Sequence, residues 1–211
     1  LAMDEVRRLT TPSQKKETEE HQLCQQIANR NATVFKAYKN WQYGLRERTS
    51  DLIFTWMNNN KERIGFQINT QKKSSLEFAS PEIQLLNRTL FGKDNVIVLF
   101  FNIRLNSYLE IIMQINSHQN KELRKSVYNV FQHDNSELFR STDTEKISET
   151  YTKIYTHKIL TSEDALKMSS DMEVLNSIEN KLEKFFTQNG EYMRIQRFIQ
   201  DHMKEFLALK K

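Results

Sequence analysis

Hydrophobic residues recur every three or four positions from Asp171 to the C-terminus. This spacing places them along one side of a helix. The stripe comprises Leu175, Ile178, Leu182 and Phe185, and then Tyr192, Ile195, Ile199, Met203 and Phe206. Asn189-Gly190 interrupts the stripe, and a short connection of this kind favours two antiparallel helices. The pattern therefore predicts a C-terminal helical hairpin.

The middle of the chain changes to a pattern typical of strands. Residues Asn95–Ile103 are almost continuously apolar, which predicts a central strand that is covered on both faces. Tyr108–Ile115 alternates between apolar and polar residues, and Thr150–Leu160 is rich in β-branched and aromatic residues, so both are predicted strands. Two helices are predicted in the same region, one opened by Ser80-Pro81 and ended by Gly92, and one over Lys121–Phe131.

Residues 51–70 also alternate, and we predict a β-hairpin there. Asp51–Met57 and Glu62–Thr70 are the two strands, and the asparagine-rich stretch between them provides a turn. In this hairpin Phe54, Trp56 and Phe66 turn toward a core. Alternation is the observation on which this prediction depends.

The N-terminal part is predicted to be helical but poor in apolar residues. Thr11-Pro12 is a good helix start, because proline fits the first helical position. Residues 13–30 carry only a thin apolar stripe, and a second helix is predicted over Ala32–Tyr43 and ended by Gly44.

Together these elements predict an α+β fold, or an α/β fold, with a mixed sheet of about five strands flanked by helices. The predicted organisation has a flexible segment at residues 1–10 and a mixed core domain at residues 11–160. The C-terminal hairpin, residues 161–211, is expected to pack on that core.

Composition narrows the class of protein. Apolar residues make up 38% and aromatic residues 10% of the 211, which is enough for a packed core. The longest apolar run, Val96–Phe101, is far shorter than the roughly 20 residues of a membrane span. Cys24 is the single cysteine, so an internal disulfide is excluded, and the first residues lack a signal-peptide pattern. We therefore expect an intracellular protein in a reducing compartment, without a membrane span.

Motifs for cofactors and metals are missing from the sequence. With only 4 glycines it contains neither of the glycine-rich phosphate-binding motifs, and its five histidines form no zinc-ligand spacing. We therefore predict no cofactor and no metal site. The net charge of +4, with an isoelectric point near 9.0, permits contact with nucleic acid without requiring it.

Three residues of the predicted hairpin suggest a resemblance to a known protein family. Asp51 opens the first strand, while Gln67 and Asn69 share the polar face of the second. With the following short helix and apolar strand, residues 45–103 resemble the core of the PD-(D/E)xK nuclease superfamily. In that family two acids bind Mg²⁺ and a lysine orients the attacking water. Asp51 matches the first acid, whereas Gln67 stands at the second acid and Asn69 at the lysine.

The resemblance implies a degenerate catalytic site. Neutral Gln67 and Asn69 leave a metal site short of charge, so the expected function is to bind DNA or RNA rather than to cleave it. If the protein is an enzyme, it is a metal-dependent nuclease that takes an acid from elsewhere, such as Glu47 or Glu77. The candidate catalytic positions are thus Asp51, Gln67 and Asn69.

Basic and aromatic residues supply the candidate nucleic-acid contacts. The predicted phosphate contacts are Arg46, Arg48, Lys72 and Lys73. Tyr38, Trp41 and Tyr43 lie near Lys36 and Lys39 and are candidates for stacking on bases, as are Tyr151, Tyr155 and His157 on one face of a strand.

A different class of function remains open, that of a protein-interaction module. In this alternative a partner docks on the C-terminal helices or on a sheet edge, without nucleic acid. Convergence of the four basic residues beside Asp51 favours nucleic acid. Exposed apolar area over residues 195–209 favours a protein partner.

Overall fold

The computed structural model describes residues 12–72, 75–104, 108–133, 137–139 and 150–210. The chain divides into two compact units, Leu1–Gly44 and Leu45–Lys211. The first unit contains α2 (Pro12–Arg30) and the beginning of α3 (Ala32–Ile64). The flexible segment expected at residues 1–10 lies outside the described part.

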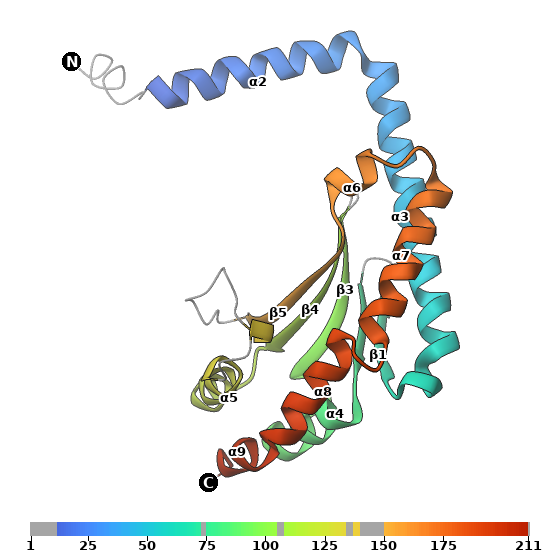
Figure 1. The fold of residues 1–211 in the computed structure, drawn as a ribbon. Helices are drawn as coiled ribbons and strands as arrows, with labels where there is room; N and C mark the ends of the chain where they lie inside the picture. The colour runs from blue at the N-terminus through green and yellow to red at the C-terminus, as the bar shows by residue number, and fades with distance from the viewer. Residues whose placement is uncertain (1–11, 73–74, 105–107, 134–136, 140–149, 211) are drawn as a thin grey trace, which may run out of the picture. The chain divides into compact units, whose positions relative to one another are not determined.

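The second unit is built on a five-stranded sheet with the strand order β1-β2-β3-β4-β5 (Figure 1). The strands are β1 (Gln67–Lys72), β2 (Ser75–Ala79), β3 (Ile97–Arg104), β4 (Tyr108–Asn116) and β5 (Tyr151–Leu160). Each strand pairs antiparallel with the next, so the sheet is a meander. The predicted α+β fold with five strands is confirmed, whereas the expected mixture of parallel and antiparallel pairs is wrong.

Strand β3 lies at the centre of the sheet, as its unbroken apolar run predicted. Ile97, Leu99 and Phe101 are fully buried on the core face, and Val98 is fully buried on the opposite face. Phe100 is only partly buried. Burial on both faces explains why this strand does not alternate in polarity.

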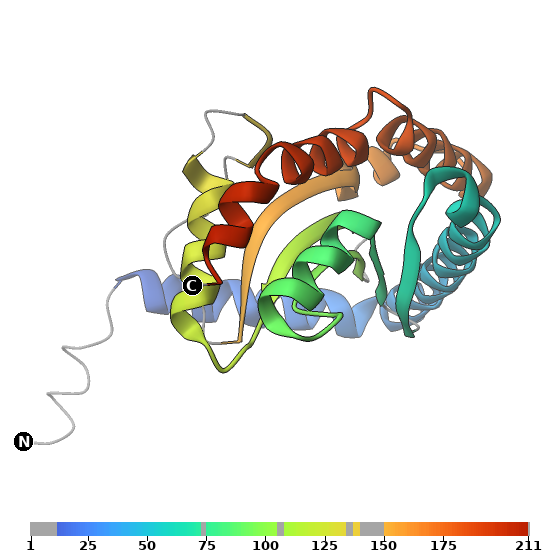
Figure 2. The same ribbon diagram turned by 90° about the horizontal axis from the view of Figure 1, so that it is seen from below.

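Helices of the second unit cover the core face of the sheet (Figure 2). They are α4 (Pro81–Leu86), the π-helix η1 (Asn87–Phe91), α5 (Lys121–His133), the 3₁₀-helix η2 (Glu137–Phe139), α6 (Ser162–Leu166), α7 (Asp171–Phe186), α8 (Glu191–Asp201) and α9 (Met203–Ala208). The predicted start of α4 is confirmed, because the Ser80 side chain accepts a hydrogen bond from the Ile83 amide. The predicted C-terminal hairpin is formed by α7 and α8.

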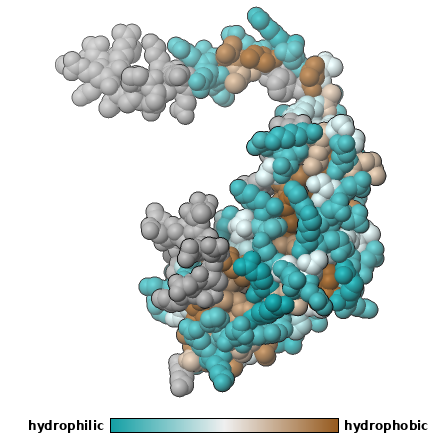
Figure 3. All heavy atoms as spheres, in the orientation of Figure 1, coloured by the Kyte–Doolittle hydropathy of each residue, from teal (hydrophilic) through white to brown (hydrophobic). Residues whose placement is uncertain are grey.

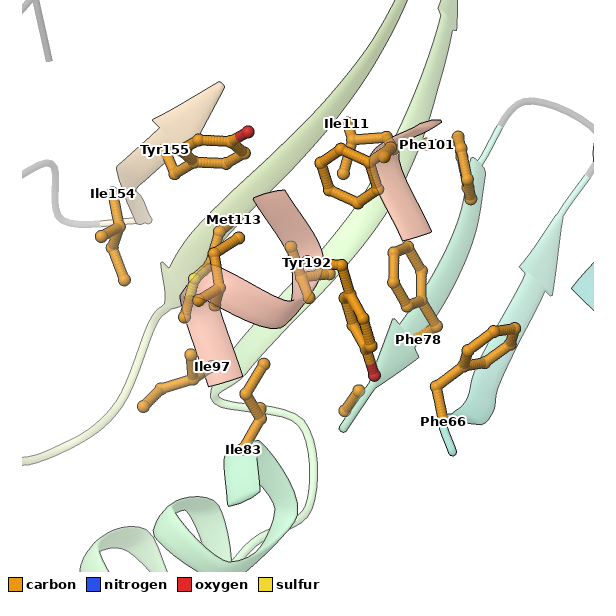
Figure 4. Packing of buried hydrophobic residues seen from close by; sticks show 14 of the residues in the cluster. Phe66, Phe78, Ile83, Ile97, Phe101, Ile111, Met113, Ile154, Tyr155 and Tyr192 are labelled. Carbon is orange, nitrogen blue, oxygen red and sulfur yellow. The ribbon is translucent and has the colours of Figure 1, made fainter. Parts of the chain in front are cut away.

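The core is dominated by aromatic rings. Phe78 of β2 stacks on Phe101 of β3 with ring centroids 5.4 Å apart, and Tyr192 of α8 packs among them (Figure 4). Phe66, just before β1, closes this end of the core, with its ring 5.6 Å from that of Phe78. The C-terminal helices and the sheet therefore share one interior.

The predicted hairpin at residues 51–70 is wrong, because Asp51–Ile64 is the second half of helix α3. Ile53, Trp56 and Met57 are buried at helical spacing. The asparagine run does not turn the chain, because Asn58 and Asn60 each donate a side-chain hydrogen bond to the carbonyl four residues earlier. Trp56 and Phe66 are nevertheless buried, as predicted.

Helix α3 ends at Ile64, just before Gly65, and not at Gly44. Gly65 has a φ of 82°, the left-handed conformation that glycine adopts readily. The amides of Gly65 and Phe66 both donate to the Lys61 carbonyl, at 2.9 and 3.1 Å, which closes the last turn. Gly44 lies inside the helix.

The described helices include none with the length and apolar character that a bilayer span requires.

Candidate functional site

The structure does not bring the three nuclease-like positions together. Asp51 is an exposed residue of α3, whereas Gln67 opens β1 and Asn69 follows it, both exposed. Helical rise places Asp51 about 20 Å along the axis from Ile64, which precedes β1. Gln67 instead accepts a hydrogen bond from the Gln84 side chain, at 2.8 Å. Within the described stretches, no cluster of three or more potential metal-binding side chains occurs.

The four basic residues proposed to contact phosphates do not form a described groove beside Asp51. Arg48 forms an ion pair with Asp171 of α7, and Arg46 is partly exposed on α3. Lys72 ends β1 and its side chain, like the whole of Lys73, lies outside the described part. Exposed apolar area on the C-terminal helices is also small, because Ile195, Ile199 and Phe206 are fully buried and Leu207 is 42% exposed.

Exposed aromatic side chains instead gather on the first part of α3. Val34, Tyr38 and Trp41 are 66%, 44% and 38% exposed. Their spacing of four and then three residues places them on one face of the helix. The Tyr38 and Trp41 rings have centroids 5.8 Å apart, and the Gln42 amide donates a hydrogen bond of 2.8 Å to the Tyr38 hydroxyl. Two aromatic rings are thus ordered against each other at the surface.

The opposite face of the same helical segment is basic. Lys36, Lys39 and Tyr43 share it, since they follow one another at three and four residues, and all three are exposed. Tyr43 is 53% exposed. We call Lys36, Lys39 and Tyr43 the basic face and Val34, Tyr38 and Trp41 the apolar face.

Acidic residues are missing from the whole segment around these faces. Residues 21–44 contain Arg30, Lys36 and Lys39 but no aspartate or glutamate, although the chain as a whole has 27 acidic residues against 31 basic ones. On α2, Leu23 and Ile27 are also exposed. Hydrophobic side chains of α2 reach the surface in Figure 3. The positive potential of this segment is therefore not offset by carboxylates of its own.

A second group of titratable residues lies on β5, in the second unit. His157 Nδ1 is 3.0 Å from Glu191 Oε2, at the first turn of α8. Burial lowers the pKa of His157, and the nearby Lys181 ammonium lowers it further. Burial likewise raises the pKa of Glu191. His157 also packs against Phe185, with ring centroids 5.0 Å apart, so the pair joins β5 to the helices.

The predicted stacking row on β5 is corrected by a bulge. Tyr155 and His157 pair with Met113 and Ile111 and face the core. The register shifts between Met113 and Gln114, where Ile154 is the extra residue of β5, so Tyr151 falls on the other face. The three side chains therefore do not form one surface.

One phenol hydroxyl, that of Tyr192, lies inside the core near α4. Tyr192 of α8 is fully buried. Burial and the Glu82 carboxylate both raise the pKa of Tyr192 above its ordinary value. The phenol therefore stays neutral and serves packing.

Sequence reasoning named the aromatic residues of α3 but not the division into two faces. The acid-free stretch at residues 21–44 was not predicted either. A count of acidic residues along residues 21–44 would have revealed it. Exposure of the rings required the structure, because the same spacing also fits a buried helix.

Searches with this chain among protein-family models, curated proteins and solved structures found no significant match.

Proposed function

We propose that the protein is a nucleic-acid-associated domain that binds without cleaving, and that the basic face of α3 makes the contact. The observation that carries this proposal is the exposed, acid-free helical segment with Lys36, Lys39 and Tyr43 on one side. It replaces the groove beside Asp51 that the sequence suggested.

Charge and ring chemistry support this assignment. Lysines at three-residue spacing project from one side of a helix and can contact neighbouring phosphates of a nucleic-acid backbone. Tyr43 on the same face offers a ring on which a base can stack. An α-helix also fits the major groove of a duplex, so both single and double strands are suitable ligands.

The absence of cleavage follows from the positions that a nuclease would use. Gln67 and Asn69 are neutral, and Asp51 lies on a helix away from them. Purified protein is therefore expected to show no Mg²⁺- or Mn²⁺-dependent cleavage. Cleavage that Asp51→Ala abolishes would contradict this part of the proposal.

Fluorescence anisotropy with labelled oligonucleotides tests the binding. The probes are single-stranded and duplex DNA and RNA. Each oligonucleotide should be longer than the roughly 4–16 nucleotides that one single-strand-binding OB-fold covers. Between about 50 and 200 mM salt, affinity should fall steeply, because bound phosphates release counterions. Binding that ignores salt, or no binding at low salt, would contradict the proposal.

Charge-reversal variants locate the contact. Lys36→Glu with Lys39→Glu should weaken binding and reduce the slope of log affinity against log salt by roughly 0.7–0.9 for each lost phosphate contact. The matched control is Lys184→Glu with Lys204→Glu, which changes the net charge equally at exposed lysines of α7 and α9. An equal loss in the control would indicate a general charge effect.

A protein-interaction module is the second candidate, and the apolar face favours it. On that face Val34 is 66% exposed, and Leu23 and Ile27 of α2, four residues apart, are 57% and 46% exposed, so aliphatic side chains reach the surface on both helices. A partner that binds there should be insensitive to salt and should be lost with Val34→Asp. The two candidates therefore differ in both the residues and the salt dependence that they predict.

A further inference from the structure

The two edges of the sheet are protected unequally. On β5, the register shifts at two places, and Lys153 and Lys158 are exposed along the strand. Bulges and lysines are the usual devices that prevent another strand from pairing with an edge. On β1, only the last residue, Lys72, is charged, and the register shifts once, between Ile68 and Thr70.

Strand β1 also lies beside a cleft. It is the edge strand of the sheet that lies nearest α3 (Figure 2). A cleft of about 640 Å³ separates the end of α3 from the beginning of β1. Phe54, Phe66 and Ile68 supply its apolar lining, and Lys61, Glu62 and Gln67 supply polar lining. This volume is within the range of about 300–1,000 Å³ that is typical of ligand sites.

The main chain of β1 has hydrogen-bonding capacity left on its outer side. Among the described residues, the main chain of β1 is hydrogen-bonded by β2 and by no other element. In an edge strand, alternate amides and carbonyls point away from the neighbouring strand. An occupant must therefore present an extended backbone, which a folded helix does not.

We infer that β1 and the cleft form a docking site for an extended peptide segment of a partner protein, which adds to the sheet as a sixth strand. Backbone pairing along β1 supplies the hydrogen bonds, and side chains of the peptide enter the cleft. The peptide residue opposite Ile68 points to the same side as Ile68, and so into the cleft that Ile68 lines. The apolar lining selects a large apolar side chain at this position.

Lys61 and Glu62 restrict the charge of the peptide. Both are exposed at the cleft, and no ion pair within the described residues involves them. Because one cation and one anion line the cleft, neither sign of peptide charge is favoured overall, and the apolar lining determines the preferred side chain. This site is separate from the basic face of α3 and does not depend on nucleic-acid binding.

Short synthetic peptides test the inference by fluorescence polarisation. The probes alternate threonine with leucine or phenylalanine, and two control sets carry aspartate at the apolar positions or N-methyl groups on the backbone. The apolar peptides should bind. Both control sets should bind at least about tenfold more weakly, a difference of about 1.4 kcal/mol in binding free energy. If no apolar peptide binds, or if the N-methylated set binds equally well, strand addition is wrong.

A matched pair of variants locates the peptide. Asn58 lines the cleft, whereas its neighbour Asn59 is exposed elsewhere on α3. Asn58→Trp should fill the cleft and abolish binding, while Asn59→Trp should leave it unchanged. Equal effects in the two variants would contradict the site.

Amide hydrogen exchange on the unmodified protein gives a test that does not depend on the folding of a variant. Peptide binding should slow exchange within residues 67–71 and leave β5 unchanged. Protection of β5 instead would overturn the assignment. A dimer in light scattering that dissociates when the peptide is added would assign the edge to a second copy of this chain rather than to a partner.

Discussion

The two tryptophans of the chain lie on the same helix in opposite circumstances. Trp56 is 4% exposed, its ring is 5.1 Å from that of Phe186, and its Nε1 donates a hydrogen bond to Glu183. Trp41 is 38% exposed and has Tyr38 as its aromatic neighbour. One tryptophan therefore belongs to the core, and the other belongs to a surface.

This contrast extends to the two halves of α3. After Gly44 the helix buries Leu45, Ile53 and Met57 in the second unit. Before Gly44, residues 29–34 and 36–41 are all exposed. Short helices without tertiary packing are only marginally stable in water. The described side chains at residues 29–34 and 36–41 add nothing to the buried core. We therefore propose that the exposed rings and lysines of this half serve recognition rather than stability.

The largest expected effect tests the buried half. Trp56→Ala should lower the free energy of unfolding by about 3–5 kcal/mol, since it empties a packed aromatic site. Urea denaturation followed by far-ultraviolet circular dichroism measures this loss. A loss below about 1 kcal/mol would show that Trp56 is not part of a packed interior.

Proline substitutions compare the two halves directly. Thr55 and Asn40 are both exposed helical residues of α3. Thr55→Pro should destabilise the second unit by about 3 kcal/mol or more, because it removes a helical hydrogen bond inside the packed half. Asn40→Pro should leave the unfolding midpoint of that unit unchanged. Equal destabilisation by both would show that the two halves of α3 fold as one unit.

Ion pairs of the buried half are expected to contribute much less. Arg63 lies 3.3 Å from Glu183, and both side chains are about half exposed. Arg63→Ala should therefore cost about 0.2–1 kcal/mol. The loss should shrink in high salt, and a loss that is independent of salt would mean that packing of the arginine stem dominates.

The smallest effect on stability is expected at the exposed tryptophan. Trp41→Ala should change the free energy of unfolding by less than about 0.5 kcal/mol, as is usual for surface substitutions. The same denaturation experiment, run beside Trp56→Ala, measures the difference. A cost above about 2 kcal/mol would place Trp41 in a packed interior and remove the contrast.

Most of the fold after Ser80 could be predicted from the sequence, whereas residues 45–70 could not. The apolar run of β3 and the helical spacing of α7 predicted the elements that the structure contains. Leu52, Phe54 and Trp56 alternate, but Ile53, Trp56 and Met57 also fit a helix, so the pattern alone is ambiguous. Packing of Trp56 against α7 decides in favour of the helix, and this contact spans much of the chain.

The candidate site was predictable only in its residue types. Lys36, Lys39 and Tyr43 were recognisable as basic and aromatic, yet spacing alone does not distinguish an exposed helix face from a buried one. The cleft beside β1 could not be predicted, because it requires both the true end of α3 and the position of β1 at the sheet edge.

Lysine footprinting by mass spectrometry tests the central claim most directly, because both halves of α3 carry exposed lysines. Lys36 and Lys39 lie in the first half, and Lys61 lies in the second. When a single-stranded or duplex oligonucleotide is added at low salt, Lys36 and Lys39 should become protected from acetylation while Lys61 stays reactive. Unchanged reactivity of Lys36 and Lys39, or protection of Lys61 instead, would contradict the account.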